Sequence, residues 1–142
     1  HLYLTPPCTK ELHGCDPNGI EELKIHYDGK YFNTIEESDR EYDVILVPNI
    51  IEHLTNPGLM VEELFAIKFK KLFVLVPNYK VYEQSSYENS IFTEKIHRDH
   101  FFWFSPYTLY NLFKNQIEAG GYECELSFFD NQNMISILVS KN

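Results

Sequence analysis

A glutamate and a histidine, Glu52 and His53, follow the end of a continuous apolar run, and two further histidines, His97 and His100, lie downstream. An imidazole titrates near neutral pH, so it can take a proton from a hydroxyl group under ordinary conditions. We therefore treat His53, then His97 and His100, as candidates for a general base. The alternative is that Glu52 and His53 form a helix entry held by structural hydrogen bonds.

Two predicted strands, Tyr42–Val47 and Leu72–Val76, would position these residues. Both runs are continuously apolar and contain β-branched residues, which is typical of strands buried on both faces of a parallel sheet covered by helices. Each run stops at a Pro-Asn pair, Pro48-Asn49 or Pro77-Asn78. Ligands of such sheets gather at the carboxyl ends of the strands, so we expect the rim of an active site there.

The rest of the chain alternates strands with helices. Helix starts are predicted where a capping residue precedes a proline, and the glycine pair 120–121 predicts a helix end. The order indicates a layered α/β fold with a mostly parallel sheet and an antiparallel C-terminal hairpin. The expected strands are Lys10–Asp16, Lys30–Ile35, Tyr42–Val47, Leu72–Val76, Tyr122–Phe129 and Met134–Ser140, with helices beginning at Pro17, Pro57 and Pro106.

Length and charge narrow the classes of function. With 142 residues, 44% of them hydrophobic, the chain has the size of one domain with a substantial core. No apolar run approaches the ~20 residues of a membrane-spanning helix, so we expect no membrane partner and a cytoplasmic location. The formal net charge of −9, from 21 acidic and 12 basic residues, repels phosphate backbones. We therefore expect no nucleic-acid partner.

Five segments, taken in order, resemble the class I S-adenosylmethionine-dependent methyltransferases, in particular their small-molecule O-methyltransferase branch. They are ELHGCDPNGIEELK, YDVILVPNIIEHLTNP, KLFVLVPN, HRDHFFWFSPYTLYNLF and the GGYE entry to the last hairpin, and they cover nearly all of residues 11–142. The resemblance implies a Rossmann-like fold and S-adenosylmethionine as the cofactor. The implied function is methyl transfer to a small-molecule hydroxyl group, for example on a sugar or natural product.

The resemblance also assigns residues to the cofactor. It places Asp16, followed by Pro17, at the strand end whose carboxylate accepts hydrogen bonds from the ribose hydroxyls. A helix N-cap is the other role open to Asp16, and the two roles are compatible. Ile35 and Glu36 are implied to flank the adenine, where a solvated acidic turn is the alternative.

The turn after the Tyr42–Val47 strand carries the remaining cofactor assignments. Pro48, Asn49 and Ile50 align with the backbone beside the methionine moiety. Some relatives hold a divalent cation with a Glu-x-x-Glu-His cluster and a distant histidine. Here Asn49 stands where the first glutamate would, which removes one anionic ligand, so we expect no metal site. A cation held by Glu52, His53 and a downstream histidine remains the alternative.

One expected motif is absent from the sequence. The family begins with a strand that ends in a glycine-rich E-x-G-x-G-x-G turn, where backbone approaches the cofactor closely, and no three glycines here have that spacing. We interpret residues 1–142 as a single, N-terminally truncated methyltransferase-like domain that lacks this strand and loop. An open sheet edge would favour association with another copy. The alternative functions are a non-catalytic methyltransferase-like domain used in binding or assembly, and a nucleotide-binding α/β domain of another family.

Overall fold

The computed structural model describes residues 11–15, 29–32, 34–35, 41–80 and 99–141. The chain divides into two compact units, residues 1–40 and 41–142, and each is described by itself. The interpretation of residues 1–142 as one domain therefore stays a prediction. No helix in the described ranges is long and apolar enough to cross a membrane.

In the first unit, two short strands pair in parallel, β1 (His13–Cys15) and β2 (Lys30–Phe32). They confirm the expected strands at these positions, in shorter form. Gly29 directly precedes β2, and a Cβ atom there would lie 2.5 Å from the carbonyl oxygen of Leu12. The missing side chain lets the backbone N–H of Lys30 donate to that same oxygen over 3.0 Å.

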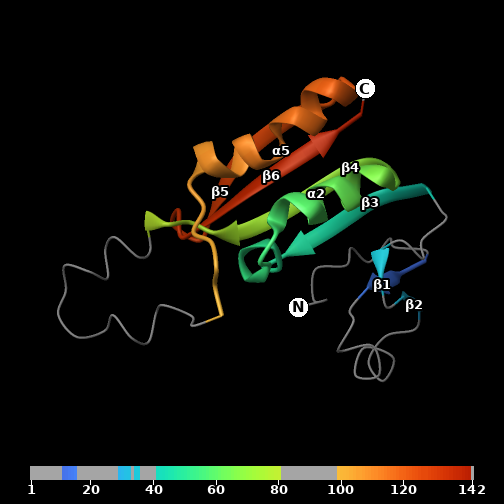
Figure 1. Ribbon diagram of the computed structural model, residues 1–142, viewed down its shortest axis with the longest axis horizontal. Coiled ribbons are helices and arrows are strands. Elements are labelled where there is room, and N and C mark those ends of the chain that lie inside the picture. Colours follow the sequence, from blue (N-terminus) through green and yellow to red (C-terminus); the bar gives the residue numbers. More distant parts are fainter. Residues whose placement is uncertain (1–10, 16–28, 33, 36–40, 81–98, 142) are drawn as a thin grey trace. The chain divides into compact units, whose positions relative to one another are not determined.

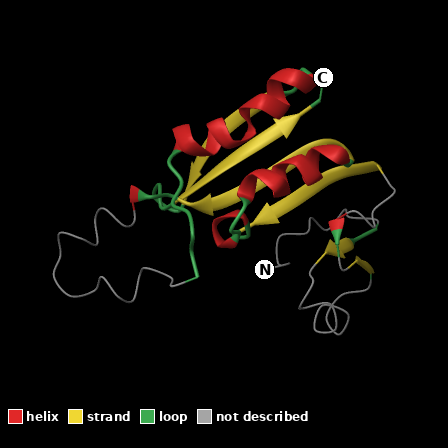
Figure 2. Ribbon diagram, in the orientation of Figure 1, coloured by secondary structure: helices red, strands yellow, loops and turns green. Residues whose placement is uncertain are grey.

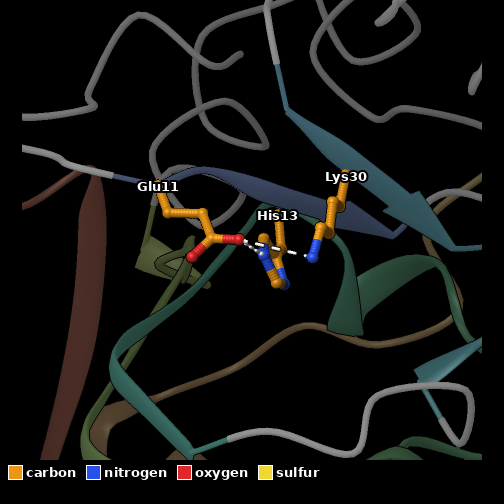
Figure 3. A network of polar contacts seen from close by, with 3 residues as sticks. All are labelled: Glu11, His13 and Lys30. Carbon is orange, nitrogen blue, oxygen red and sulfur yellow. Dashed lines mark hydrogen bonds and ion pairs between the residues drawn. The ribbon is translucent and has the colours of Figure 1, made fainter.

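A polar cluster joins these two strands. Glu11 Oε1 lies 3.0 Å from His13 Nε2 and 3.6 Å from Lys30 Nζ, so that one carboxylate serves both side chains (Figure 3). The imidazole is almost fully buried, whereas Glu11 and Lys30 are half exposed. Exposed ion pairs contribute little to stability, so the main role of Glu11 is to satisfy the buried His13 ring.

The second unit is a four-stranded sheet in the order β3-β4-β6-β5 (Figure 1). Its strands are β3 (Glu41–Pro48), β4 (Lys68–Pro77), β5 (Glu123–Phe129) and β6 (Met134–Ser140). β3 pairs with β4 in parallel, and β6 pairs antiparallel with both β4 and β5. Three of the four strands thus run in one direction, and the expected α/β architecture with an antiparallel C-terminal hairpin is confirmed.

Helices α2 (Pro57–Ala66) and α5 (Pro106–Gly120) lie over the same face of this sheet (Figure 2). Both begin as the sequence predicts. The Asn56 side chain accepts a hydrogen bond from the backbone N–H of Leu59, and the Ser105 hydroxyl accepts one from that of Thr108. Gly121, with φ of 65°, ends α5 in the left-handed conformation.

The core lies between the sheet and these two helices. Its strand residues form cross-strand rows such as Val47–Val74–Ile137, and α5 contributes Leu109 and Phe113. The opposite face of β3 differs from the prediction, because Val44 and Leu46 are nearly half exposed. Within the described ranges β3 has β4 as its only sheet neighbour, so burial on both faces is not reached.

Candidate active site

The candidate site lies where β3 ends. Pro48 closes the strand, and the backbone N–H of Asn49 still donates to the carbonyl of Leu75 in β4 over 2.8 Å. Asn49 then takes a positive φ of 51°, a conformation that asparagine tolerates better than most residues. The chain turns there into the short 3-10 helix η3 (Ile51–His53), so residues 49–53 lie at the carboxyl edge of the sheet as expected.

Glu52 is the most unusual residue of this turn. It is only 1% exposed, and neither of its carboxylate oxygens has a hydrogen-bond partner among the described residues. Burial raises the pKa of its carboxyl group, although the backbone N–H of Glu52 itself and, to a smaller extent, His53 oppose the shift. A buried acid without a donor is costly unless a proton or a bound cation compensates it, so Glu52 is a functional candidate.

The segment after residue 98 is fastened to this turn by its backbone. The carbonyl oxygen of Glu52 accepts hydrogen bonds from the N–H groups of Phe101 and Phe102, over 2.8 and 3.2 Å. His53 Nδ1 lies 3.1 Å from the carbonyl oxygen of Asp99, which requires Nδ1 to carry the proton as donor. His100 is thereby brought beside His53, with ring centroids 4.5 Å apart and the rings edge to face.

Glu52, His53 and His100 form a cluster in which one potential ligand atom from each lies within 4.8 Å of the others. When Nδ1 of His53 donates to Asp99, its Nε2 keeps a lone pair that can accept a proton or bind a metal ion. The donor set of two imidazoles and one carboxylate fits a divalent transition cation. The same contacts also agree with the alternative that Glu52 and His53 form a helix entry held by structural hydrogen bonds.

The structure unites part of the predicted site. His53 and His100 come together, and Pro48, Asn49 and Ile50 occupy the turn beside them. Ile35 lies in the first unit. The predicted residues Asp16, Pro17, Glu36 and His97 fall outside the described residues.

Sequence reasoning missed the burial of Glu52 and the part played by backbone groups of residues 99–102. The only signal for the first was the position of an acid directly after an apolar run. No sequence signal identifies a carbonyl as a hydrogen-bond partner of an imidazole.

No protein-family model matches this chain. No curated protein matches it either. Comparison with solved structures, by contrast, gives several matches of similar folds.

A chain of the Pnkp1/Rnl/Hen1 RNA repair complex matches with a TM-score of 0.68 and 12% identity, over 92% of this chain and 31% of that one. The small RNA methyltransferase HEN1 matches with a TM-score of 0.68 and 15% identity, over 92% and 20% of the two chains. Magnesium protoporphyrin IX methyltransferase of Synechocystis PCC 6803, solved with bound SAH, matches with a TM-score of 0.62 and 7% identity, over 93% and 64%. The chain thus spans about a third or less of the first two of these structures.

These matches correct one expectation. Nucleic acid was excluded as a partner on charge, yet the similar structures include a small RNA methyltransferase and chains of an RNA repair complex. Net charge is a sum over the whole chain, and base stacking at a local site does not depend on it. The net charge of this chain also says nothing of the rest of such proteins, because the chain corresponds to only 20–32% of the matched chains.

The matches agree with the expected methyltransferase reading and with S-adenosylmethionine as the cofactor, since methyltransferases recur among them and one holds SAH. The small-molecule branch is not confirmed. At these low identities a structural likeness establishes the fold. This chain has the Rossmann-like fold of the class I S-adenosylmethionine-dependent methyltransferases.

Proposed function

We propose that this chain is the catalytic part of an S-adenosylmethionine-dependent methyltransferase that acts on a hydroxyl group. The observation that carries the proposal is the cluster of Glu52, His53 and His100, with a buried carboxylate lacking described partners, at the strand edge where this fold binds its ligands. The methyltransferases among the similar structures support the same reading.

In the proposed reaction the methyl group passes from the sulfonium sulfur to the acceptor oxygen. The carbon–sulfur bond breaks and its electron pair stays on sulfur, while the hydroxyl proton leaves. The enzyme's main task is to align the two reactants. Nε2 of His53 is placed to receive the proton, because Nδ1 is engaged with the Asp99 carbonyl.

Cation binding is the alternative role of the cluster, because an Nε2 of His53 that binds a metal ion has no lone pair left to accept the hydroxyl proton. Glu52, His53 and His100 would hold a divalent ion, which would supply a positive charge to orient the acceptor hydroxyl and favour its ionised form. The buried carboxylate fits this role, since a cation would compensate its charge. Asn49 keeps the ligand set less anionic than the Glu-x-x-Glu-His pattern.

RNA is the acceptor class that we favour. The support is that a chain of an RNA repair complex and a small RNA methyltransferase both match this fold with a TM-score of 0.68, against 0.62 for the protoporphyrin methyltransferase. A small-molecule hydroxyl is the second candidate. Its support is that a methyltransferase named for a small molecule, magnesium protoporphyrin IX, shares this fold, and that the net charge of −9 repels phosphate backbones.

The cofactor assignments from the sequence remain part of the proposal. Asp16 and Pro17 would contact the ribose, Ile35 and Glu36 the adenine, and the turn from Pro48 the methionine moiety. Binding or assembly without catalysis remains the alternative function.

Calorimetry with S-adenosylhomocysteine tests the cofactor proposal. We expect binding by the 142-residue chain, or by the natural full-length protein if that is longer, and weaker binding after Asp16→Ala. Labelled methyl transfer to RNA and to small hydroxyl compounds then separates the acceptor classes. If no form of the protein binds the cofactor, the enzyme proposal is wrong.

A further inference from the structure

Three aromatic residues in a row, Phe101, Phe102 and Trp103, follow His100 directly and are exposed to solvent. Their exposed fractions are 57%, 37% and 49%. We call residues 101–103 the aromatic strip. Large aromatic side chains usually bury most of their surface. Three consecutive exposed aromatic residues therefore indicate a surface that contacts a partner.

The strip is held in place by its backbone and by one buried neighbour. The N–H groups of Phe101 and Phe102 both donate to the carbonyl of Glu52. The ring of Phe102 stacks on that of Phe104, with centroids 6.2 Å apart and planes 25° apart, and Phe104 is buried. The Phe104 carbonyl accepts the N–H of Tyr79 at the end of β4. The strip is thus fixed at both ends while its side chains stay partly exposed to solvent.

We propose that the aromatic strip is a stacking platform for an unpaired base of an RNA strand, next to the reacting group. This proposal rests on the proposed function, because the strip begins one residue after His100 of the candidate cluster. Exposed aromatic rings are the side chains on which single-stranded RNA bases stack, without regard to sequence.

The charge of the chain favours stacking over phosphate contacts as the source of affinity. With a net charge of −9, the chain gains little from counterion release. Stacking needs no net positive charge, and an acidic protein can use it to position one nucleotide. A base on the strip would place its own ribose, or a neighbouring one, beside Glu52, His53 and His100.

Trp103 is the only tryptophan of the chain and lies in the strip, so its fluorescence reports directly on the site. The experiment titrates the chain, without cofactor, with a short single-stranded RNA and with the same RNA carrying abasic residues. The expected result is quenching of Trp103 by the RNA. The abasic strand, which keeps every phosphate, should bind much more weakly.

Matched variants separate stacking from other effects. Phe101→Leu keeps an apolar side chain but removes the ring, and should weaken binding roughly 5- to 150-fold, which corresponds to ~1–3 kcal/mol for a base–aromatic stack. Phe128→Leu is the control, because Phe128 is also 49% exposed but lies on β5, at the other side of the sheet from β3. Phe101→Tyr, which retains a ring, should bind like the wild type.

The platform is refuted if RNA does not quench Trp103, or if the abasic strand binds as well as the intact one. It is equally refuted if folded Phe101→Leu, checked by circular dichroism, keeps wild-type affinity. If Phe101→Leu does not fold, the abasic comparison on the wild type decides. Calorimetry with S-adenosylhomocysteine distinguishes the two proposals: RNA binding without cofactor binding supports the platform and rejects the methyltransferase function.

Discussion

The substitution Glu52→Gln tests whether the buried cluster exists to hold a cation. Without a cation, wild-type Glu52 carries a buried carboxylate with no described partner, whereas glutamine has the same shape and no charge. A buried neutral polar group without a partner costs ~1–3 kcal/mol, and a charged one costs more. In chelator we therefore expect Glu52→Gln to be more stable than the wild type by about 1 kcal/mol.

A bound cation should reverse this order. At a cation concentration 100 times the dissociation constant, binding raises the free energy of unfolding by about 2.7 kcal/mol. For a chain of this size that is a rise of roughly 8–11 °C in the unfolding midpoint. Glu52 is the only carboxylate of the cluster, so the glutamine variant should lose most of the rise.

The assay is thermal unfolding followed by circular dichroism, in chelator and then in Mn²⁺ or Mg²⁺. Mn²⁺ should stabilise more than Mg²⁺, because Mg²⁺ prefers an all-oxygen ligand set. Glu62→Gln is the matched control, since Glu62 is an exposed acid ten residues away that loses the same charge. The cation site is refuted if Mn²⁺ leaves the unfolding midpoint of the wild type unchanged, or if it raises the midpoints of the wild type and Glu52→Gln by the same amount.

Three further predictions follow from particular contacts. Burial raises the folded-state pKa of the Glu52 carboxyl group above its ordinary 4.5. The stability contributed by the protonated carboxyl group is therefore fully present below pH 4.5 and is lost as the pH rises through the folded-state pKa. In chelator, the unfolding free energy of the wild type relative to Glu52→Gln should fall over that interval in denaturant titrations, and a flat difference would contradict the pKa shift. Asn78→Ala should lower the unfolding free energy by ~1–3 kcal/mol, because the fully buried amide donates to the Gln132 carbonyl over 2.8 Å. The control Asn115→Ala changes an exposed asparagine and should have little effect. Equal effects of the two substitutions would refute a stabilising role of the Asn78 hydrogen bond. Leu46→Lys should reduce any self-association seen by sedimentation, since Leu46 is an exposed apolar residue on β3; unchanged association would place the interface elsewhere.

Much of the fold was predictable because its signals are local. The Asn56-Pro57 and Ser105-Pro106 pairs begin α2 and α5, and the apolar run before Pro48 forms β3. Each of these rests on capping, proline geometry or periodicity within a few residues. The exposed face of β3 was not predictable, because burial depends on which segment lies against a strand and not on the strand alone.

Only part of the candidate site could be predicted from the sequence, because the rest depends on contacts between residues that are distant in the chain. Glu52 and His53 are neighbours in the chain, so their pairing could be seen at once. The approach of His100 depends on three hydrogen bonds between residues some 50 positions apart, two to the Glu52 carbonyl and one from the His53 ring to the Asp99 carbonyl. Such contacts leave no pattern in side-chain types. Net charge did not exclude a nucleic-acid partner, because it is a sum over the whole chain, whereas nucleic acid is recognised at a local site.

Methyl transfer from S-adenosylmethionine can be measured as transfer of a labelled methyl group to RNA by the natural full-length protein. We expect label in RNA in the presence of Mn²⁺ and little change for Glu62→Gln. His53→Ala should lose at least about 100-fold in rate, because it removes either a general base, typically worth ~10²–10⁴, or a metal ligand. Label in neither RNA nor small hydroxyl compounds, from protein shown by calorimetry to be folded and saturated with cofactor, would contradict the account.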